Sequence, residues 1–130
     1  MSTETSKRTV VIDLDNTLAD YVGGWDKHKD FPGDPYQDVV FELRRLKAQG
    51  WLIGILTTRP TELTWKWINT HNLRDLIEFV NDNPHQPKDA STHKPIAFCY
   101  IDDRGIRFTG HNMREIVDGL LAGEFQPWGK

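Results

Sequence analysis

Short apolar runs alternate with segments of helical periodicity along this chain. The runs have strand length and are rich in β-branched or aromatic residues; they cover 9–14 (TVVIDL), 51–56 (WLIGIL), 77–80 (IEFV) and 96–101 (IAFCYI). Runs with consecutive apolar positions are typical of strands that are buried on both faces of a parallel sheet. We therefore predict a strand at each of them.

Three further segments have apolar residues at helical spacing. They cover 36–49, 61 to about 71, and 112–121. Gly50 stands where the first of these helices would end, and Pro60 suits the first turn of the second. Because strands and helices alternate, we predict an α/β fold with a mostly parallel sheet and helices on both faces, which is a three-layer α/β/α sandwich.

Residues 19–35 (ADYVGGWDKHKDFPGDP) break both patterns. The stretch is polar and rich in Gly, Asp and Pro, which indicates a loop. It is long for a plain connection, and long loops in compact domains tend to be functional. An exposed lid with Trp25 as its anchor is one interpretation of this loop.

Composition and charge narrow the class of protein. A chain of 130 residues has the length of one domain, which we expect over 9–130. The first eight residues (MSTETSKR) are polar, and we expect them to form a flexible tail. The net charge of −3 gives no reason to expect long-range attraction to nucleic acid or to an anionic membrane. One cysteine, Cys99, excludes an internal disulfide and fits a reducing compartment. No apolar segment has signal or membrane-spanning length, so we expect a cytoplasmic protein.

Acidic and hydroxyl residues follow the predicted strands. They are Asp13, Asp15, Thr57, Asp102 and Asp103. Parallel strands bring their carboxyl ends to one edge of a sheet, so these side chains should converge although they are far apart in sequence. Carboxylates from two strands would form an oxygen cage suited to Mg²⁺, which takes a few carboxylates together with waters and a substrate phosphate.

Each of these motifs alone also has a simpler interpretation. Asp13 and Asp15 fit a strand-end turn, and Thr57 or Thr58 fits an N-cap ahead of Pro60. Arg59 fits either a substrate ligand for phosphate or carboxylate, or a solvated loop charge. The acidic pair at 102–103 fits a local salt bridge with the next residue, an arginine.

Taken together, the motifs resemble those of the haloacid dehalogenase superfamily. Residues 13–18 (DLDNTL) resemble the first motif of that family, Thr57 within ILTTRP the second, Lys94 the third, and Asp102-Asp103 after YI the fourth. The four occur in the order that the family uses, and they span most of the chain.

The resemblance implies a Rossmann-like, HAD-like fold and a Mg²⁺-dependent phosphatase that works through an aspartyl-phosphate. Asp13 would attack phosphorus. Asp15 would protonate the leaving alkoxide and then activate water. Thr57 and Lys94 would hold the phosphoryl oxygens, although Lys94 stands only eight positions before Asp102. Lys88 is the competing candidate for that lysine.

The resemblance also implies the metal ligands. Mg²⁺ would be held by Asp13, by the backbone carbonyl of Asp15 and by Asp102. Asp103 would bind the metal through a water molecule or contact one of these ligands. We further assign substrate binding to three residues beside the first two motifs, which are Asn16, Thr58 and Arg59.

The interval between the first two motifs holds a loop and one helix but no cap domain. Capless members of the family have open sites and often act on bulky substrates. We therefore expect a phosphorylated small molecule, such as a nucleotide, as substrate. The segment IDDR also resembles polynucleotide 3′-phosphatases and nucleotidase-like members of the family, so a nucleic-acid end is an alternative substrate. This resemblance implies that Trp25 and the basic residues after it lie over the site and stack on a base. A second alternative is a non-catalytic protein of this fold that binds phosphate or nucleotide.

Overall fold

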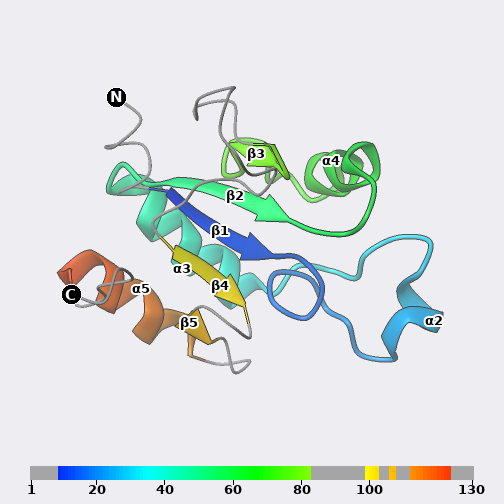
Figure 1. Ribbon diagram of the computed structural model, residues 1–130, viewed down its shortest axis with the longest axis horizontal. Coiled ribbons are helices and arrows are strands. Elements are labelled where there is room, and N and C mark those ends of the chain that lie inside the picture. Colours follow the sequence, from blue (N-terminus) through cyan, green and yellow to red (C-terminus); the bar gives the residue numbers. More distant parts are fainter. Residues whose placement is uncertain (1–8, 83–98, 103–105, 108–111, 124–130) are drawn as a thin grey trace, which may run out of the picture.

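The computed structural model describes residues 9–82, 99–102, 106–107 and 112–123 (Figure 1). The predicted tail at 1–8 lies outside these ranges. None of the helices within them is long and apolar enough to cross a membrane.

The described strands form one parallel sheet in the order β3-β2-β1-β4-β5 (Figure 1). Their bounds are Thr9–Asp13 for β1, Leu52–Leu56 for β2, Phe79–Val80 for β3, Cys99–Asp102 for β4 and Ile106–Arg107 for β5. The α/β fold with a parallel sheet is therefore confirmed. The sequence predicted β1 to β4 but not β5, because two residues are too few to form a pattern.

The register aligns the carboxyl ends of the central strands. Asp13 of β1 lies opposite Leu56 of β2, and Ile12 lies opposite Ile101 of β4. The next residues along β1 and β4 are Asp13 and Asp102, so their backbone positions are neighbours on adjacent parallel strands. The strand ends thus meet at one edge of the sheet.

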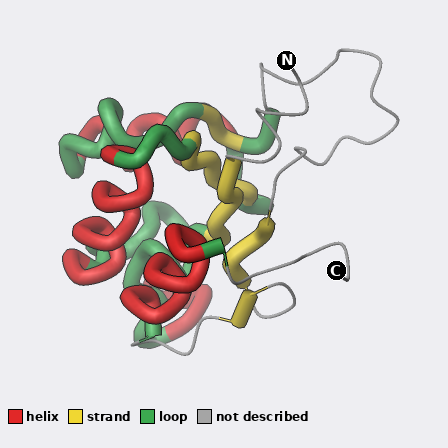
Figure 2. Tube along the Cα trace, turned by 90° about the vertical axis from the view of Figure 1, so that its left-hand side faces the viewer, coloured by secondary structure: helices red, strands yellow, loops and turns green. Residues whose placement is uncertain are grey.

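The helices of the described ranges are α2 (Gly24–His28), α3 (Gln37–Ala48), α4 (Thr61–Thr70) and α5 (Met113–Ala122). The bounds of α3, α4 and α5 agree with those of the predicted helices to within a residue or two at each end. The short helix α2 was not predicted, because it lies inside the Gly- and Asp-rich loop. In Figure 2 the helices gather on one side of the strands.

One face of the sheet carries the main hydrophobic core. Val10 and Ile12 of β1 are fully buried there against Leu43 of α3, Trp67 of α4 and Val117 of α5. The long helices α3, α4 and α5 all contribute to this one cluster. The predicted sandwich also has helices on the opposite face of the sheet, and this second helical layer stays a prediction.

The other face of the sheet carries a smaller apolar cluster. Val11 and Phe79 are buried there, and Leu56 and Tyr100 pack against them. A side chain on Gly54 would meet the Phe79 ring at 2.2 Å, so this strand position accepts only glycine without a shift of the ring. Successive side chains of a strand point to opposite faces, which places Asp13 on this face together with Val11.

Candidate active site

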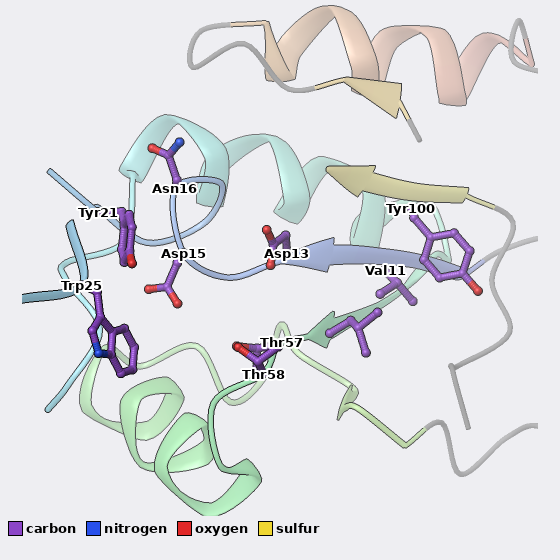
Figure 3. A pocket seen from close by; sticks show the side chains of 10 residues that line it. Val11, Asp13, Asp15, Asn16, Tyr21, Trp25, Thr57, Thr58 and Tyr100 are labelled. Carbon is purple, nitrogen blue, oxygen red and sulfur yellow. The ribbon is translucent and has the colours of Figure 1, made fainter. Parts of the chain in front are cut away.

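A pocket of about 700 Å³ opens at the carboxyl edge of the sheet (Figure 3). It is lined by Val11, Asp13, Asp15, Asn16, Tyr21, Trp25, Leu56, Thr57, Thr58 and Tyr100. Five of these residues were candidates from the sequence: Asp13, Asp15, Asn16, Thr57 and Thr58. The structure brings all five together around one cavity.

A tight turn after β1 places Asp13 and Asp15 in the same pocket. The backbone N–H of Leu14 donates to Oδ1 of Asp13 at 2.9 Å, which orients this carboxylate. The carbonyl of Leu14 then accepts the N–H groups of Leu18 and Ala19 at 3.0 and 2.8 Å, so the strand does not continue. The two carboxylates therefore share the pocket through a turn and not through an extended strand.

Arg59 forms a two-point ion pair with Asp15. Its Nε donates to Oδ2 at 2.8 Å and its Nη2 to Oδ1 at 2.9 Å. The Arg59 side chain is 1% exposed and that of Asp15 is 24% exposed. The interpretation of Arg59 as a solvated loop charge is therefore wrong. Its role as a direct substrate ligand stays a prediction, since this guanidinium already binds Asp15.

Two further contacts fix the Arg59 guanidinium. Nη2 also donates to the carbonyl of His28 at 2.8 Å, and the Trp25 ring covers the guanidinium at 5.1 Å from its centroid. Nη1 is buried and has no hydrogen-bond partner in the described part of the chain. Arg59 thus joins the turn after β1 to the loop at 19–35.

Thr57 is held by hydrogen bonds from both sides. Its backbone N–H donates to Oδ1 of Asn81 at 2.9 Å, and its Oγ1 accepts the N–H of Arg59 at 3.1 Å. Since that oxygen accepts a hydrogen bond, its O–H remains available as a donor. The N-cap residue of α4 is Pro60, so the interpretation of Thr57 or Thr58 as a helix cap is wrong.

Sequence reasoning missed Asn81, which holds the backbone of Thr57. This residue follows β3 directly and has a positive φ of 65°. Its Nδ2 also donates to Oγ1 of Thr61 at 3.1 Å. The signal was present, because the rule that polar residues at strand ends converge applies to Asn81 as it does to Thr57.

The loop at 19–35 is closed at its base and anchored to α4. Ala19 pairs with Pro35, and the N–H of Asp20 donates to the carbonyl of Asp34 at 2.8 Å. Nε1 of Trp67 donates to the carbonyl of Gly33 at 2.8 Å. A side chain on Gly33 would meet the Asp20 carbonyl at 2.3 Å, so only glycine fits this close approach.

Two rings of the same loop reach the pocket. Tyr21 stacks on the ring of His28 with 5.9 Å between ring centroids, and Nε2 of His28 is 2.7 Å from the carbonyl of Val22. His28 is buried, whereas Trp25 is 54% exposed. Tyr21 was not predicted from the sequence, since nothing distinguishes it there from the other polar and aromatic residues of the loop.

The loop base holds a carboxylate with a shifted pKa. The backbone N–H of Val22 donates to Oδ1 of Asp20 at 2.9 Å and lowers the pKa of that carboxyl below its ordinary value of 3.8. A weaker bond from the Tyr36 hydroxyl acts in the same direction. The pKa of Tyr36 is raised above 10.0, chiefly by desolvation and then by the charge of Asp20.

The remaining candidates are placed in part or not at all. Lys88, Lys94 and Asp103 lie outside the described residues. For Asp102 the structure describes only the backbone, which lies at the end of β4 next to the end of β1. Within the described ranges, no three His, Cys, Asp or Glu side chains form a group that could hold a metal ion. Of the predicted metal ligands, Asp13 and Asp15 line the pocket.

Comparisons with known proteins agree with the fold. A solved structure of a conserved protein from Bacteroides thetaiotaomicron is similar to the chain, with a TM-score of 0.64 and 20% identity over 94% of this chain and 97% of that one. No protein-family model matches the chain, and no curated protein matches it significantly. At this identity the likeness shows the fold alone.

Proposed function

We propose that the protein is a capless phosphatase of the haloacid dehalogenase type, which hydrolyses phosphomonoesters with Mg²⁺ through an aspartyl-phosphate. One observation carries this proposal: Asp13, Asp15 and Thr57, from two strand ends, line a single pocket at the carboxyl edge of a parallel sheet. Ligands bind at this edge in open α/β folds. The finer fold, a Rossmann-like three-layer sandwich without a cap, belongs to the same proposal.

Asp13 is the proposed nucleophile. The Leu14 N–H that bonds to its Oδ1 fixes the carboxylate at the end of the central strand. We assign the attack on phosphorus to Oδ2. A new bond forms between this oxygen and phosphorus while the bond from phosphorus to the leaving oxygen breaks, which leaves an aspartyl-phosphate on Asp13.

Asp15 is the proposed acid and base. It would give a proton to the leaving alkoxide and then take one from the water that attacks the aspartyl-phosphate. Asp13 and inorganic phosphate are released, and Asp15 regains its proton. In the present conformation both oxygens of Asp15 accept N–H groups of Arg59. The side chain must therefore release one of these bonds before it carries the proton to the substrate.

Hydroxyl and amide groups line the pocket beside the two carboxylates. Thr57 and Thr58 would donate to the phosphoryl oxygens, together with Lys94, and these donors would stabilise charge that develops during transfer. Mg²⁺ fits the donor chemistry of Asp13, Asp15 and Asp102, and Asp103 would support these ligands. When bound, it would neutralise charge on the phosphoryl group and on the carboxylates.

Phosphate release tests this proposal directly. We expect Mg²⁺-dependent hydrolysis of p-nitrophenyl phosphate and of a panel of nucleotides. Asp13→Asn removes the attacking carboxylate and should lower kcat on the order of a thousandfold. Asp38→Asn is the matched control, because Asp38 is exposed at the start of α3 and does not line the pocket.

Two results would count against the proposal. If Asp13→Asn kept the wild-type rate, Asp13 would not be the nucleophile. If the wild-type protein bound phosphate esters but hydrolysed none of them with Mg²⁺ present, the non-catalytic binding protein would be the better account.

A further inference from the structure

The pocket has two chemically different ends. Figure 3 shows Tyr21 and Trp25 at one end beside Asp15, Asp13 and Thr57 further along, and Tyr100 with Val11 at the other end. Val11 is buried and packs with its neighbours as a part of the smaller core. At the end formed by Tyr21 and Trp25, Trp25 is 54% exposed, so a substrate group can be added there.

We propose that Tyr21 and Trp25 form the leaving-group subsite, and that the leaving group carries a planar ring of the nucleobase class. This inference rests on the proposed phosphatase function, because it takes Asp13 and Thr57 as the position of the phosphoryl group. It assigns the substrate class, a nucleoside monophosphate, from the contacts of the two aromatic residues.

The exposure of Trp25 is the first observation. Indole rings offer a large apolar surface, and tryptophan is enriched where proteins contact other molecules. The guanidinium of Arg59 lies over the Trp25 ring, and its side chain is buried and tied to Asp15. This contact holds the indole in place, while the residue as a whole is 54% exposed and lines the pocket. Its remaining surface is suited to a second ring.

The fixed position of Tyr21 is the second observation. Its ring stacks on His28 with an interplanar angle of 27°, and His28 is itself buried and bonded to the Val22 carbonyl. The loop that carries both rings is closed at its base and anchored by Trp67. Two pre-positioned rings lose little side-chain freedom when a ligand binds.

The polar groups beside the two rings select the kind of ring. Asn16 and Asp15 line the pocket next to Tyr21 and Trp25. An amide both donates and accepts hydrogen bonds, so Asn16 can pair with the polar edge of a base. An aliphatic leaving group without polar atoms would make no hydrogen bond with the Asn16 amide. A pocket of about 700 Å³ lies within the range that holds ligands of nucleotide size.

Paired substrates that differ only in the base test the inference. We would measure kcat/KM for adenosine 5′-monophosphate, adenosine 3′-monophosphate and ribose 5-phosphate. The faster of the two nucleotides is then compared with ribose 5-phosphate. We expect the nucleotide to be preferred at least about tenfold, because stacking of a base on an aromatic side chain contributes on that order. Trp25→Leu should reduce this preference to near unity, and Trp25→Phe should keep part of it.

Trp65→Phe is the matched control. Trp65 also lies under an arginine, with Cζ of Arg74 at 4.2 Å from its ring centroid, but it does not line the pocket. It should leave the preference unchanged. If Trp25→Leu lowered kcat/KM equally for both substrates, Trp25 would act only through Arg59, and the inference would be overturned.

A binding measurement separates this inference from the proposed function. In the Asp13→Asn background, we expect calorimetry to show tighter binding of adenosine monophosphate than of ribose 5-phosphate, and Trp25→Leu should abolish the difference. Base-selective binding with no hydrolysis by the wild type would reject the phosphatase and keep the subsite. Hydrolysis without selectivity for the base would keep the phosphatase and reject the subsite.

Discussion

Arg59 shows most clearly how a single residue takes its role from tertiary structure. In the sequence it is one arginine in the segment TTRP. In the structure it is buried, binds both oxygens of Asp15 and lies against Trp25. A buried charge is stable only when it is paired, so Asp15 and Arg59 depend on each other.

The Asp15–Arg59 pair leads to a stability prediction. Arg59→Met should lower the free energy of unfolding by roughly 2–3 kcal/mol, somewhat less than for a fully buried pair, because Asp15 keeps part of its exposure. The matched control is Arg44→Met. Arg44 pairs with Asp75 at 2.9 Å with side chains 43% and 70% exposed, so its loss should change stability by less than about 1 kcal/mol.

Urea denaturation of the single and double variants measures the coupling. Asp15→Asn should destabilise the wild type more than it destabilises Arg59→Met, since the carboxylate has already lost its partner there. Strictly additive effects would mean that the two side chains do not depend on each other.

Individual residues were predictable where a local rule applies. Asp13, Asp15 and Thr57 follow apolar runs, and parallel pairing brings such positions to one edge. Tyr21 and the partner of Arg59 could not be predicted, because each depends on how the loop at 19–35 folds back over the turn after β1. The sequence pattern carries no information about such a contact.

At the scale of elements, the loop at 19–35 is the part that differs most from its sequence interpretation. The pattern indicates an irregular connection, but the structure has a closed base, a short helix and an anchor on α4. Its anchoring tryptophan is Trp67, which comes from the helix, whereas Trp25 faces the pocket. Strands and long helices were predictable because their apolar periods extend over many residues, and α2 is too short for such a period.

Asp20 makes the closure of this loop sensitive to acid. Its pKa lies below 3.8 in the folded protein, chiefly because of the Val22 N–H bond, so the carboxylate stabilises the fold at pH values above about 4. That contribution is lost as the pH falls through the lowered pKa. Asp20→Asn keeps an acceptor for Val22 but cannot titrate.

Urea midpoints at pH 6 and pH 3 provide the measurement. The wild type should be more stable than Asp20→Asn at pH 6, and this difference should shrink at pH 3, so the wild type should lose more stability between these two values. An equal loss in both proteins would show that Asp20 has no part in the acid response.

At the scale of the whole molecule, the sheet separates packing from chemistry. Helices α3, α4 and α5 pack on one face through Val10, Ile12 and their neighbours, while Asp13 belongs to the other face with Val11. The parallel sheet was predictable from the alternation of elements. The number of layers was not, because a strand that is apolar at every position does not reveal what covers each of its faces.

The central claim is that Asp13 forms a bond to phosphorus at this strand end. Trapping of the aspartyl-phosphate tests it most directly. The Asp15→Asn variant lacks the proposed base for the second step, while p-nitrophenolate leaves without a proton donor, so the intermediate should accumulate in this variant. After rapid acid quench with p-nitrophenyl phosphate and Mg²⁺, peptide mass spectrometry should find a phosphoryl group on Asp13. A phosphoryl group on another residue, or turnover with none on the peptide that contains Asp13, would contradict the account.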